Sequence, residues 1–289
     1  MDTAVFSVVY TGVELFLPEL LRSLSDQTDN DFTLFLINDG MADLEKHLEK
    51  VDLDVEVLEK SVPAAELRKI GIEWIISKGA KKIIFVDADD HVANNRVEVT
   101  KEMLDEYDII VNELMLIGES YSKPVTMFGK FFEERKEIST DDMMTGNCMG
   151  LTNTAIRAES ISRDIESVPN NIIAFDWALF AMCIHAGARA VFTKETQTYY
   201  RQHNNNTAFI QCFSEQQIMR GVKVKRDHYK LMTKFYKEYD SYAEEFENLL
   251  SQLQGNNGLK QEYCEAVRHQ GQSISLWWEP IKSLEELGI

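Results

Sequence analysis

The side chains best placed for chemistry in this chain are carboxylates that follow an apolar run at residues 83–86. Asp87 and Asp89 lie two positions apart, so in extended backbone both side chains project the same way, with Cα atoms roughly 6 to 7 Å apart. One divalent cation fits between such carboxylates, and oxygen ligands select a hard ion such as Mn²⁺ or Mg²⁺. An acidic turn that simply ends a strand is the alternative interpretation, and the rest of the sequence has to decide between the two.

The elements that must position these carboxylates follow from the hydrophobic pattern. The run at residues 83–86 is typical of a strand buried on both faces of a parallel sheet, and such sheets bind ligands at the carboxyl ends of their strands. Earlier patterns predict strands at residues 4–9, 32–37 and 53–58, alternating with helices at 14–26 and 42–49 and with a helix that begins at Pro63 and stops before Gly79. This alternation predicts right-handed crossovers that bring Asp39 to the same edge as Asp87 and Asp89.

Composition limits the classes of function. The 289 residues suffice for one large α/β domain with an appendage. Asp and Glu total 48 against 30 Lys and Arg, a formal charge of -18, which argues against a nucleic-acid partner. The 4 cysteines form no Cys-x-x-Cys pair and no disulfide framework, no apolar run approaches the ~20 residues of a membrane span, and the first residues lack the basic start of a signal peptide. We therefore expect a cytoplasmic protein without a transmembrane segment.

Four short segments follow one another in a recognisable order. They read SLSDQTDNDF at residues 23–32, NDG at 38–40, ELRKIGI at 66–72 and VDADD at 86–90. In order and spacing they resemble motifs of the nucleotide-sugar glycosyltransferases of the GT-A fold, in particular the inverting group called family 2, and the resemblance covers about residues 4–208. It implies an α/β fold with a Rossmann-like, mostly parallel sheet flanked by helices at residues 1–208, and a C-terminal helical region at 209–289.

The resemblance implies a donor site with four named roles. Asp39 would recognise the base of the nucleotide, usually uracil, and Arg68 would help to hold the nucleotide and its diphosphate. Asp87 would reach the ribose, and Asp89 would bind Mn²⁺ or Mg²⁺. The chemistry is consistent, because carboxylates accept hydrogen bonds from base N–H groups and hydroxyls, and a divalent ion bridges diphosphate oxygens.

The loop after the first strand departs from the family pattern. It reads Tyr10-Thr11-Gly12 where relatives often have Thr-Tyr-Asn, so the aromatic residue expected against the base is displaced by one position. Tyr10 and Thr11 are still expected to contact the nucleotide. Met41 also replaces a Ser of the family turn.

Asp176 is the candidate catalytic base. The segment at residues 172–180 resembles the family's Glu-Asp-Trp motif, whose Asp is the proposed base, and an apolar helix continues from it until Gly187. A lone Asp at the start of a buried helix is otherwise an N-terminal cap, which is the alternative role. Phe175 stands where many relatives carry Glu, so one carboxylate replaces an acidic pair.

The segment at residues 198–206 follows a strand predicted at 190–192 and resembles the family's Tyr-Arg-Gln-His motif. His203 could ligate the metal or donate a hydrogen bond to the diphosphate, and Arg201 could neutralise phosphate charge. A polar loop with an incidental His is the alternative. Residues 113–140 carry a weaker pattern, which we interpret as a surface-exposed loop, and residues 149–157 resemble the family's small-residue turn and strand.

The C-terminal composition predicts amphipathic helices at residues 214–237 and 242–253, then a break at 255–258 and a last helix near 261–269. We expect these helices to pack on the catalytic domain or to form a homodimer. Trp277 and Trp278 could instead give peripheral membrane contact, but acidic neighbours disfavour an anionic membrane surface.

The combined expectation is a metal-dependent inverting glycosyltransferase that moves a sugar from a nucleoside-diphosphate donor, a UDP-sugar by resemblance, to an acceptor hydroxyl. The acceptor would be a glycan or lipid-linked molecule of bacterial surface glycan synthesis. A nucleotidyltransferase is one alternative, but it would need a basic Gly-rich loop, and residues 10–14 contain no basic residue. A non-catalytic nucleotide-sugar or glycan-binding protein of the same fold is the other alternative, favoured only by the missing Glu before Asp176.

Overall fold

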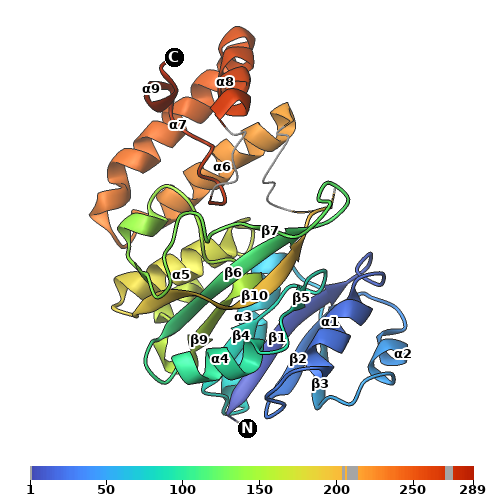
Figure 1. Ribbon diagram of the computed structural model, residues 1–289. Coiled ribbons are helices and arrows are strands. Elements are labelled where there is room, and N and C mark those ends of the chain that lie inside the picture. The colour runs from blue at the N-terminus through green and yellow to red at the C-terminus, as the bar shows by residue number, and fades with distance from the viewer. Residues whose placement is uncertain (1, 204–205, 207–213, 271–275) are drawn as a thin grey trace.

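The computed structural model describes residues 2–203, 206, 214–270 and 276–289. The predicted boundary between residues 208 and 209 and the asparagines at positions 204 and 205 lie outside these residues. In the described part, a ten-stranded sheet carries helices on both faces, and a further group of helices lies above it in the view of Figure 1. The predicted α/β class with a helical C-terminal region is confirmed.

The first four strands form the parallel half of the sheet that the sequence predicts. They are β1 (Thr3–Tyr10), β2 (Thr33–Asp39), β3 (Val55–Glu59) and β4 (Lys82–Phe85). Their spatial order is β3-β2-β1-β4, each neighbouring pair is parallel, and Tyr10 lies in register with Asp39. Because the strands run in one direction, their carboxyl ends meet at one edge, and that edge carries most of the predicted site residues.

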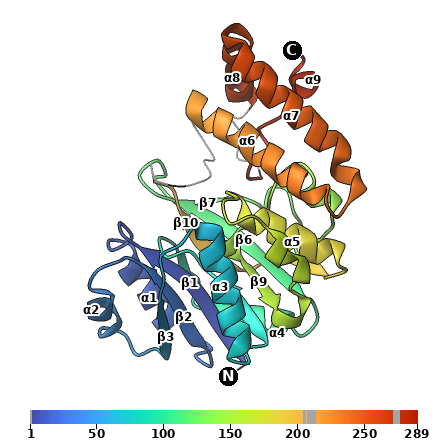
Figure 2. The same cartoon turned by 180° about the vertical axis from the view of Figure 1, so that it is seen from behind.

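Helices cover both faces of this parallel half. Its helices are α1 (Leu17–Ser25), α2 (Leu44–Leu48), α3 (Ala64–Ser77) and α4 (Arg96–Met103). Helices α1 and α4 lie on one face and α3 on the other (Figures 1 and 2). Alternate strand residues enter the two cores, since Ala4 and Phe6 of β1 pack on the α3 side while Val5 and Val9 pack on the α1 side. The central strand β4 is likewise buried on both faces, as predicted.

The remaining strands extend the sheet as a mixed half. They are β5 (His91–Val92), β6 (Ile109–Ile117), β7 (Val125–Thr126), β8 (Glu137–Ile138), β9 (Thr154–Arg157) and β10 (Ala190–Arg201). Strand β9 runs antiparallel to β4 and to β6, and β10 runs parallel to β6. Helix α5 (Phe175–His185) covers the same face as α3 (Figure 2). The strand expected within residues 149–157 is therefore present as β9.

The interpretation of residues 113–140 as a surface-exposed loop holds for residues 118–124 but is wrong at the start of the segment and around Phe128. Its first five residues belong to β6, and Phe128 is fully buried. Glu113 obscures the pattern because it is a charged residue inside a buried strand. Its carboxylate accepts hydrogen bonds from the backbone N–H groups of Leu114 and Phe128, at 2.9 and 2.8 Å, and from the Thr126 hydroxyl. These three donors satisfy the buried acid and make its burial tolerable.

The strand predicted at residues 190–192 is also longer than expected. Strand β10 continues to Arg201 across an irregularity between Thr193 and Gln197, where its register with β6 shifts. Exposed Lys194 and Glu195 lie in this irregularity, which is why the hydrophobic pattern breaks there. The polar-loop alternative therefore fails for residues 198–201, and His203 follows directly from the sheet.

The C-terminal helices are α6 (Glu215–Met232), α7 (Asp240–Gly255), α8 (Asn257–Gln270) and the short α9 (Leu284–Leu287). The break predicted at residues 255–258 is present but shorter, because Asn256 alone separates α7 from α8. The Asn256 side chain accepts a hydrogen bond from the backbone N–H of Leu259 at 3.1 Å, so it caps the start of α8.

Trp277 belongs to the core. Its side chain is only 6% exposed, and its ring packs edge-on against Phe128 and Tyr200 at centroid distances of 5.5 and 5.6 Å. Packing on the sheet-bearing part of the chain is thus the observed arrangement for this residue. Within the described ranges, no helix has both the length and the apolar composition needed to cross a membrane.

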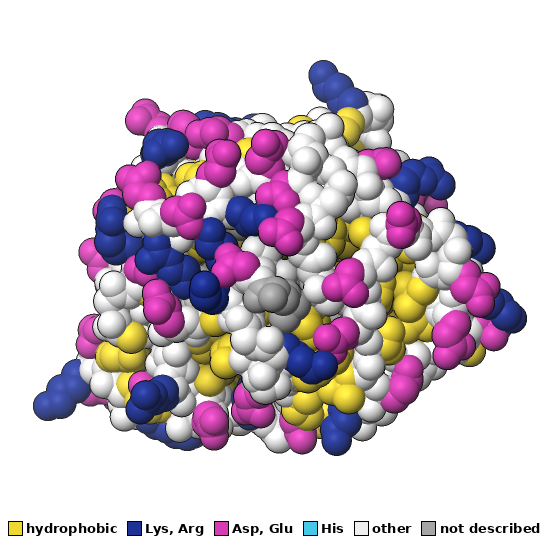
Figure 3. All heavy atoms as spheres, turned by 90° about the horizontal axis from the view of Figure 1, so that it is seen from below, with side chains coloured by type: hydrophobic (Ala, Val, Ile, Leu, Met, Phe, Trp, Pro, Cys, Tyr) yellow, Lys and Arg dark blue, Asp and Glu magenta, His cyan; other side chains and the backbone are white. Residues whose placement is uncertain are grey.

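Charges of both signs are interspersed on the face seen from below. Figure 3 shows Lys and Arg side chains accompanied by Asp and Glu side chains over this view. This face is therefore of mixed charge.

Candidate active site

A hydrogen bond joins the loop after β1 to the turn after β2, which carries Asp39. Asn38 fixes the turn after β2, because its side chain accepts from the backbone N–H of Met41 at 2.8 Å and donates to the Met41 carbonyl at 3.0 Å. The Thr11 hydroxyl donates to the Gly40 carbonyl at 2.9 Å, which joins this turn to the loop after β1. The half-exposed carboxylate of Asp39 makes no hydrogen bond or ion pair with any described residue. It is therefore available to an incoming ligand.

Asp89 and His203 meet beside Tyr10. The Nε2 atom of His203 lies 2.8 Å from Oδ2 of Asp89, and the Tyr10 hydroxyl donates to the same oxygen at 3.4 Å. Burial and the nearby carboxylates of Asp89 and Asp87 raise the pKa of Tyr10, so its hydroxyl stays protonated and keeps donating. The structure thus brings together His203 and Asp89, although they are distant in the sequence.

The sequence suggests that Arg201 neutralises phosphate charge, but in the structure its guanidinium binds other residues of the protein. Its Nε donates to the Asp89 carbonyl at 3.0 Å, and its Nη2 is ion-paired with Glu19 of α1. The guanidinium also lies over the Phe16 ring, 4.8 Å from the centroid, and Phe16 stacks on His203. Arg201 therefore stabilises the backbone at Asp89. The sequence does not identify Glu19 and Phe16, because nothing in the local sequence pattern links them to Arg201.

Asp90 is the fully buried member of the acidic turn. Its carboxylate accepts from the backbone N–H of Arg201 at 2.7 Å and from the hydroxyl of Thr152. Burial, with the charges of Asp89 and Asp87, raises the pKa of Asp90 well above its usual range. Asp90 therefore links the acidic turn to β10 and so helps to fix the position of the neighbouring Asp89.

Asp87, Arg68 and Asp176 form an electrostatic group. Burial raises the pKa of Asp87, the positive charge of Arg68 opposes that rise, and the charges of Asp89 and Asp176 add to it. Burial likewise raises the pKa of Asp176 to about 6, opposed by hydrogen bonds and by Arg68. The positive charge of Arg68 on α3 thus favours the ionised form of both carboxylates.

Asp176 lies in the first turn of α5, and Ala174 occupies the N-cap position. Asp176 is therefore not the N-cap residue of α5. Oδ1 of Asp176 accepts from the backbone N–H of Trp177 at 2.9 Å, and Oδ2 accepts from the Asn147 side chain at 3.2 Å. Phe175, at the position where relatives carry Glu, is only 2% exposed and packs in the core, so this departure from the family pattern serves packing.

The donor set for a metal is small. Among the described residues, no three or more His, Cys, Asp or Glu side chains are grouped so as to hold a metal ion. Asp89 and His203 offer two donors whose Oδ2 and Nε2 atoms converge. They fit a divalent ion that takes its other ligands from diphosphate oxygens and water, as Mg²⁺ commonly does.

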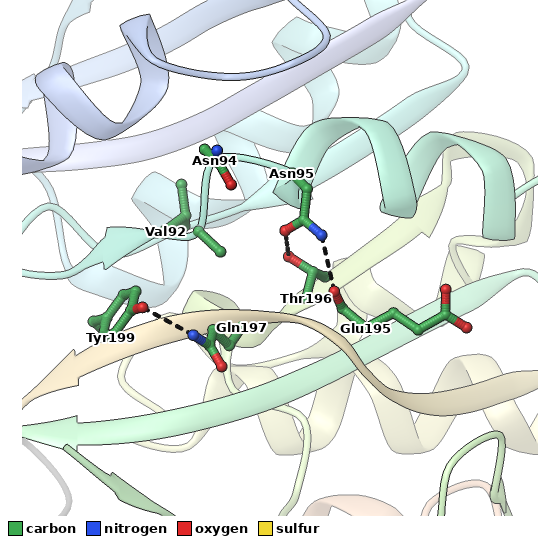
Figure 4. Close-up of a pocket in the computed structure, with 8 residues that line it drawn as sticks. Val92, Asn94, Asn95, Glu195, Thr196, Gln197 and Tyr199 are labelled. Carbon is green, nitrogen blue, oxygen red and sulfur yellow. Dashed lines mark hydrogen bonds between the residues drawn. The ribbon is translucent and has the colours of Figure 1, made fainter.

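A surface pocket of about 480 Å³ lies away from these residues, between β5, the start of α4 and β10 (Figure 4). Several of its polar groups already bind one another. Asn95 donates to the Glu195 carbonyl and accepts from Thr196, and Gln197 donates to the Tyr199 hydroxyl. None of the predicted site residues lines this pocket.

Comparison with known proteins gives a family and a fold. A family profile described as "Glycosyl transferase family 2" matches residues 5–156. No curated protein sequence matches the chain. Among solved structures, S. aureus TarS in complex with UDP-GlcNAc is similar at a TM-score of 0.60 and 19% identity, covering 86% of this chain and 72% of that one.

Two further structures share the fold at lower identity. GalNAc-T7 with UDP, GalNAc and Mn²⁺ has a TM-score of 0.58 and 12% identity, covering 99% of this chain and 53% of that one. The mannosyltransferase PcManGT from Pyrobaculum calidifontis, in complex with GDP-Man and Mn²⁺, has a TM-score of 0.57 and 11% identity, covering 95% of this chain and 76% of that one.

Proposed function

Since the chain belongs to glycosyl transferase family 2, we propose that it transfers a sugar, with inversion, from a nucleoside-diphosphate donor to an acceptor hydroxyl, and that the donor is a UDP-sugar. The observation that carries the proposal is the environment of Asp176, whose carboxylate accepts hydrogen bonds from Trp177 and Asn147 and interacts electrostatically with Arg68 and Asp87. A base, a cation and a donor-binding acid are thereby grouped at one place. The similarity to TarS, crystallised with UDP-GlcNAc, supports the choice of a uridine donor.

In this proposal the side chains divide the work between donor and acceptor. Asp39, with Tyr10 and Thr11, holds the base, Asp87 accepts from the ribose hydroxyls, and Arg68 faces the diphosphate. Asp89 and His203 would hold Mn²⁺ or Mg²⁺, which supplies Lewis-acid stabilisation of the leaving diphosphate when bound.

Asp176 carries out the proton transfer. Its carboxylate takes the proton of the acceptor hydroxyl as that oxygen attacks the anomeric carbon from the face opposite the diphosphate. A pKa of about 6 leaves the carboxylate ionised at neutral pH yet basic enough to accept a proton. We propose that the acceptor is a glycan or lipid-linked molecule in bacterial surface glycan synthesis.

Replacing Asp39 by Ala tests the donor site. We expect the variant to bind UDP about 10- to 100-fold more weakly, because a hydrogen bond to a charged group contributes about 1.5 to 3 kcal/mol. Isothermal titration calorimetry measures this effect, which should be present with or without Mn²⁺.

Asp52→Ala provides the matched control, since Asp52 is an exposed carboxylate in the loop before β3, at the other end of the strands. It should bind UDP as the wild type does. Equal UDP affinity of the wild type and Asp39→Ala would reduce the turn after β2 to a structural role and count against a nucleotide donor.

A further inference from the structure

A C-terminal segment reaches a residue beside Asp176. Trp277 and Asn147 form an antiparallel bridge in which the backbone N–H of Asn147 donates to the Trp277 carbonyl at 2.8 Å and that of Trp277 donates to the Asn147 carbonyl at 3.0 Å. Both residues are buried. The bridge therefore fixes the backbone of Asn147 from a part of the chain far away in sequence.

The Asn147 side chain spans the gap to Asp176. Its Oδ1 accepts from the backbone N–H of Met149 at 2.9 Å and its Nδ2 donates to the Met149 carbonyl at 3.4 Å, so Met149 fixes the orientation of the amide group. That Nδ2 donates to Oδ2 of Asp176 at 3.2 Å. Since Oδ1 of Asp176 already accepts from Trp177, both carboxylate oxygens have a fixed donor.

Two glycines make room for the C-terminal segment. A Cβ atom at Gly150 would lie 2.6 Å from the Trp277 ring, and one at Gly146 would lie 3.1 Å from the Cβ atoms of Leu276 and Glu279. A side chain at Gly150 would therefore force the Trp277 ring to move, and one at Gly146 would push the segment by a few tenths of an ångström. The Trp277 ring closes over this turn and packs on Phe128.

We propose that Asn147 is a positioning residue for Asp176, and that the segment at residues 276–279 holds Asn147 in place. The C-terminal region then belongs to the catalytic apparatus as well as to the core. The inference rests on the proposed role of Asp176 as general base. An N–H donor on Oδ2 orients the carboxylate and stabilises its ionised form.

The charged groups that face Asp176 set the sign of the expected effect. Arg68 on α3 favours the ionised carboxylate of Asp176, and the negative charge of Asp176 in turn raises the pKa of Asp87 after β4. The hydrogen bond from Asn147 lowers the pKa of Asp176 and so works with Arg68 against burial. Removing that bond should raise the pKa of Asp176.

The first test needs no substrate. Protein labelled with ¹³C at the aspartate carboxyl carbons is titrated by NMR, and Asp176→Asn assigns the Asp176 resonance. We expect Asn147→Ala to raise the pKa of Asp176, while Asn153→Ala leaves it unchanged. Asn153 is the matched control because it is also a fully buried amide near this turn, but it donates to the carbonyls of Asn112 and Cys148.

The second test measures turnover of the donor on which the wild type acts. Asn147→Ala and the isosteric Asn147→Asp should lower kcat by about 10- to 100-fold, as expected for a lost hydrogen bond to a charged group, with donor Kd unchanged. Trp277→Leu, which keeps an apolar side chain, should lower kcat in the same direction. In an Asp176→Asn background, Asn147→Asp should have no further effect on kcat.

The outcomes separate this inference from the proposed function. An active Asp176→Asn variant would refute Asp176 as the base. If Asp176→Asn is inactive but both Asn147 variants keep the wild-type kcat and Asn147→Ala keeps the wild-type Asp176 pKa, only the positioning role is overturned. If Trp277→Leu keeps the wild-type kcat, the claim that the segment at residues 276–279 holds Asn147 in place is wrong.

Discussion

Asp176→Asn is expected to lower kcat for sugar transfer by about 10² to 10⁴-fold, the usual contribution of a general base, while donor affinity stays near that of the wild type. Asn cannot take the proton of the acceptor hydroxyl at neutral pH. It is isosteric with Asp, and its amide oxygen can still accept from the backbone N–H of Trp177. Steady-state transfer kinetics with a calorimetric donor Kd measure the two quantities separately.

Asp164→Asn is the matched control for this variant. Asp164 lies in the turn Arg163–Ser167, which packs against α5, but its carboxylate is outside the electrostatic group of Arg68 and Asp87. Its kcat should equal that of the wild type. Transfer by Asp176→Asn within about threefold of the wild type, far short of a general-base effect, would mean that another group takes the proton.

Asp89→Asn is expected to abolish the metal-dependent part of nucleotide binding. The neutral amide is a poor ligand for a hard divalent ion, so the Kd for UDP with Mn²⁺ should rise to the value measured without metal. Isothermal titration calorimetry with and without Mn²⁺ gives both values. The fold should persist, because Asn can still accept from Tyr10 and His203, which surround Oδ2.

Asp105→Asn serves as the control for Asp89→Asn, because Asp105 is a solvent-exposed carboxylate just after α4, paired with Lys82. It should retain the metal dependence of the wild type. If Asp89→Asn also retained that dependence, the metal site would have to be sought away from Asp89 and His203.

The parallel half of the fold and the edge that carries the site could be predicted because each strand there is a continuous local signal. The apolar run of β4 ends at Asp87, and the turn after β2 places Asp39 at the same edge by topology alone. The alternation of strands and helices decides the direction of the chain. No tertiary information is needed for these steps.

The parts that could not be predicted depend on contacts between distant residues. Glu113 reads as a surface charge, since its three hydrogen-bond donors become evident only when the segment after β6 folds back on it. Asn147 reads as one polar residue among others, because its link to Asp176 forms in three dimensions. Arg201 is ion-paired with Glu19, a contact that spans most of the chain.

The most direct measurement is proton NMR of the wild-type protein incubated with Mn²⁺ and a panel of α-linked UDP-sugars and GDP-mannose. We predict that one donor is consumed, that its nucleoside diphosphate is released, and that the sugar appears first as the β anomer. A single displacement by a hydroxyl or by water requires this inversion. Release of the α anomer first would contradict the inverting mechanism.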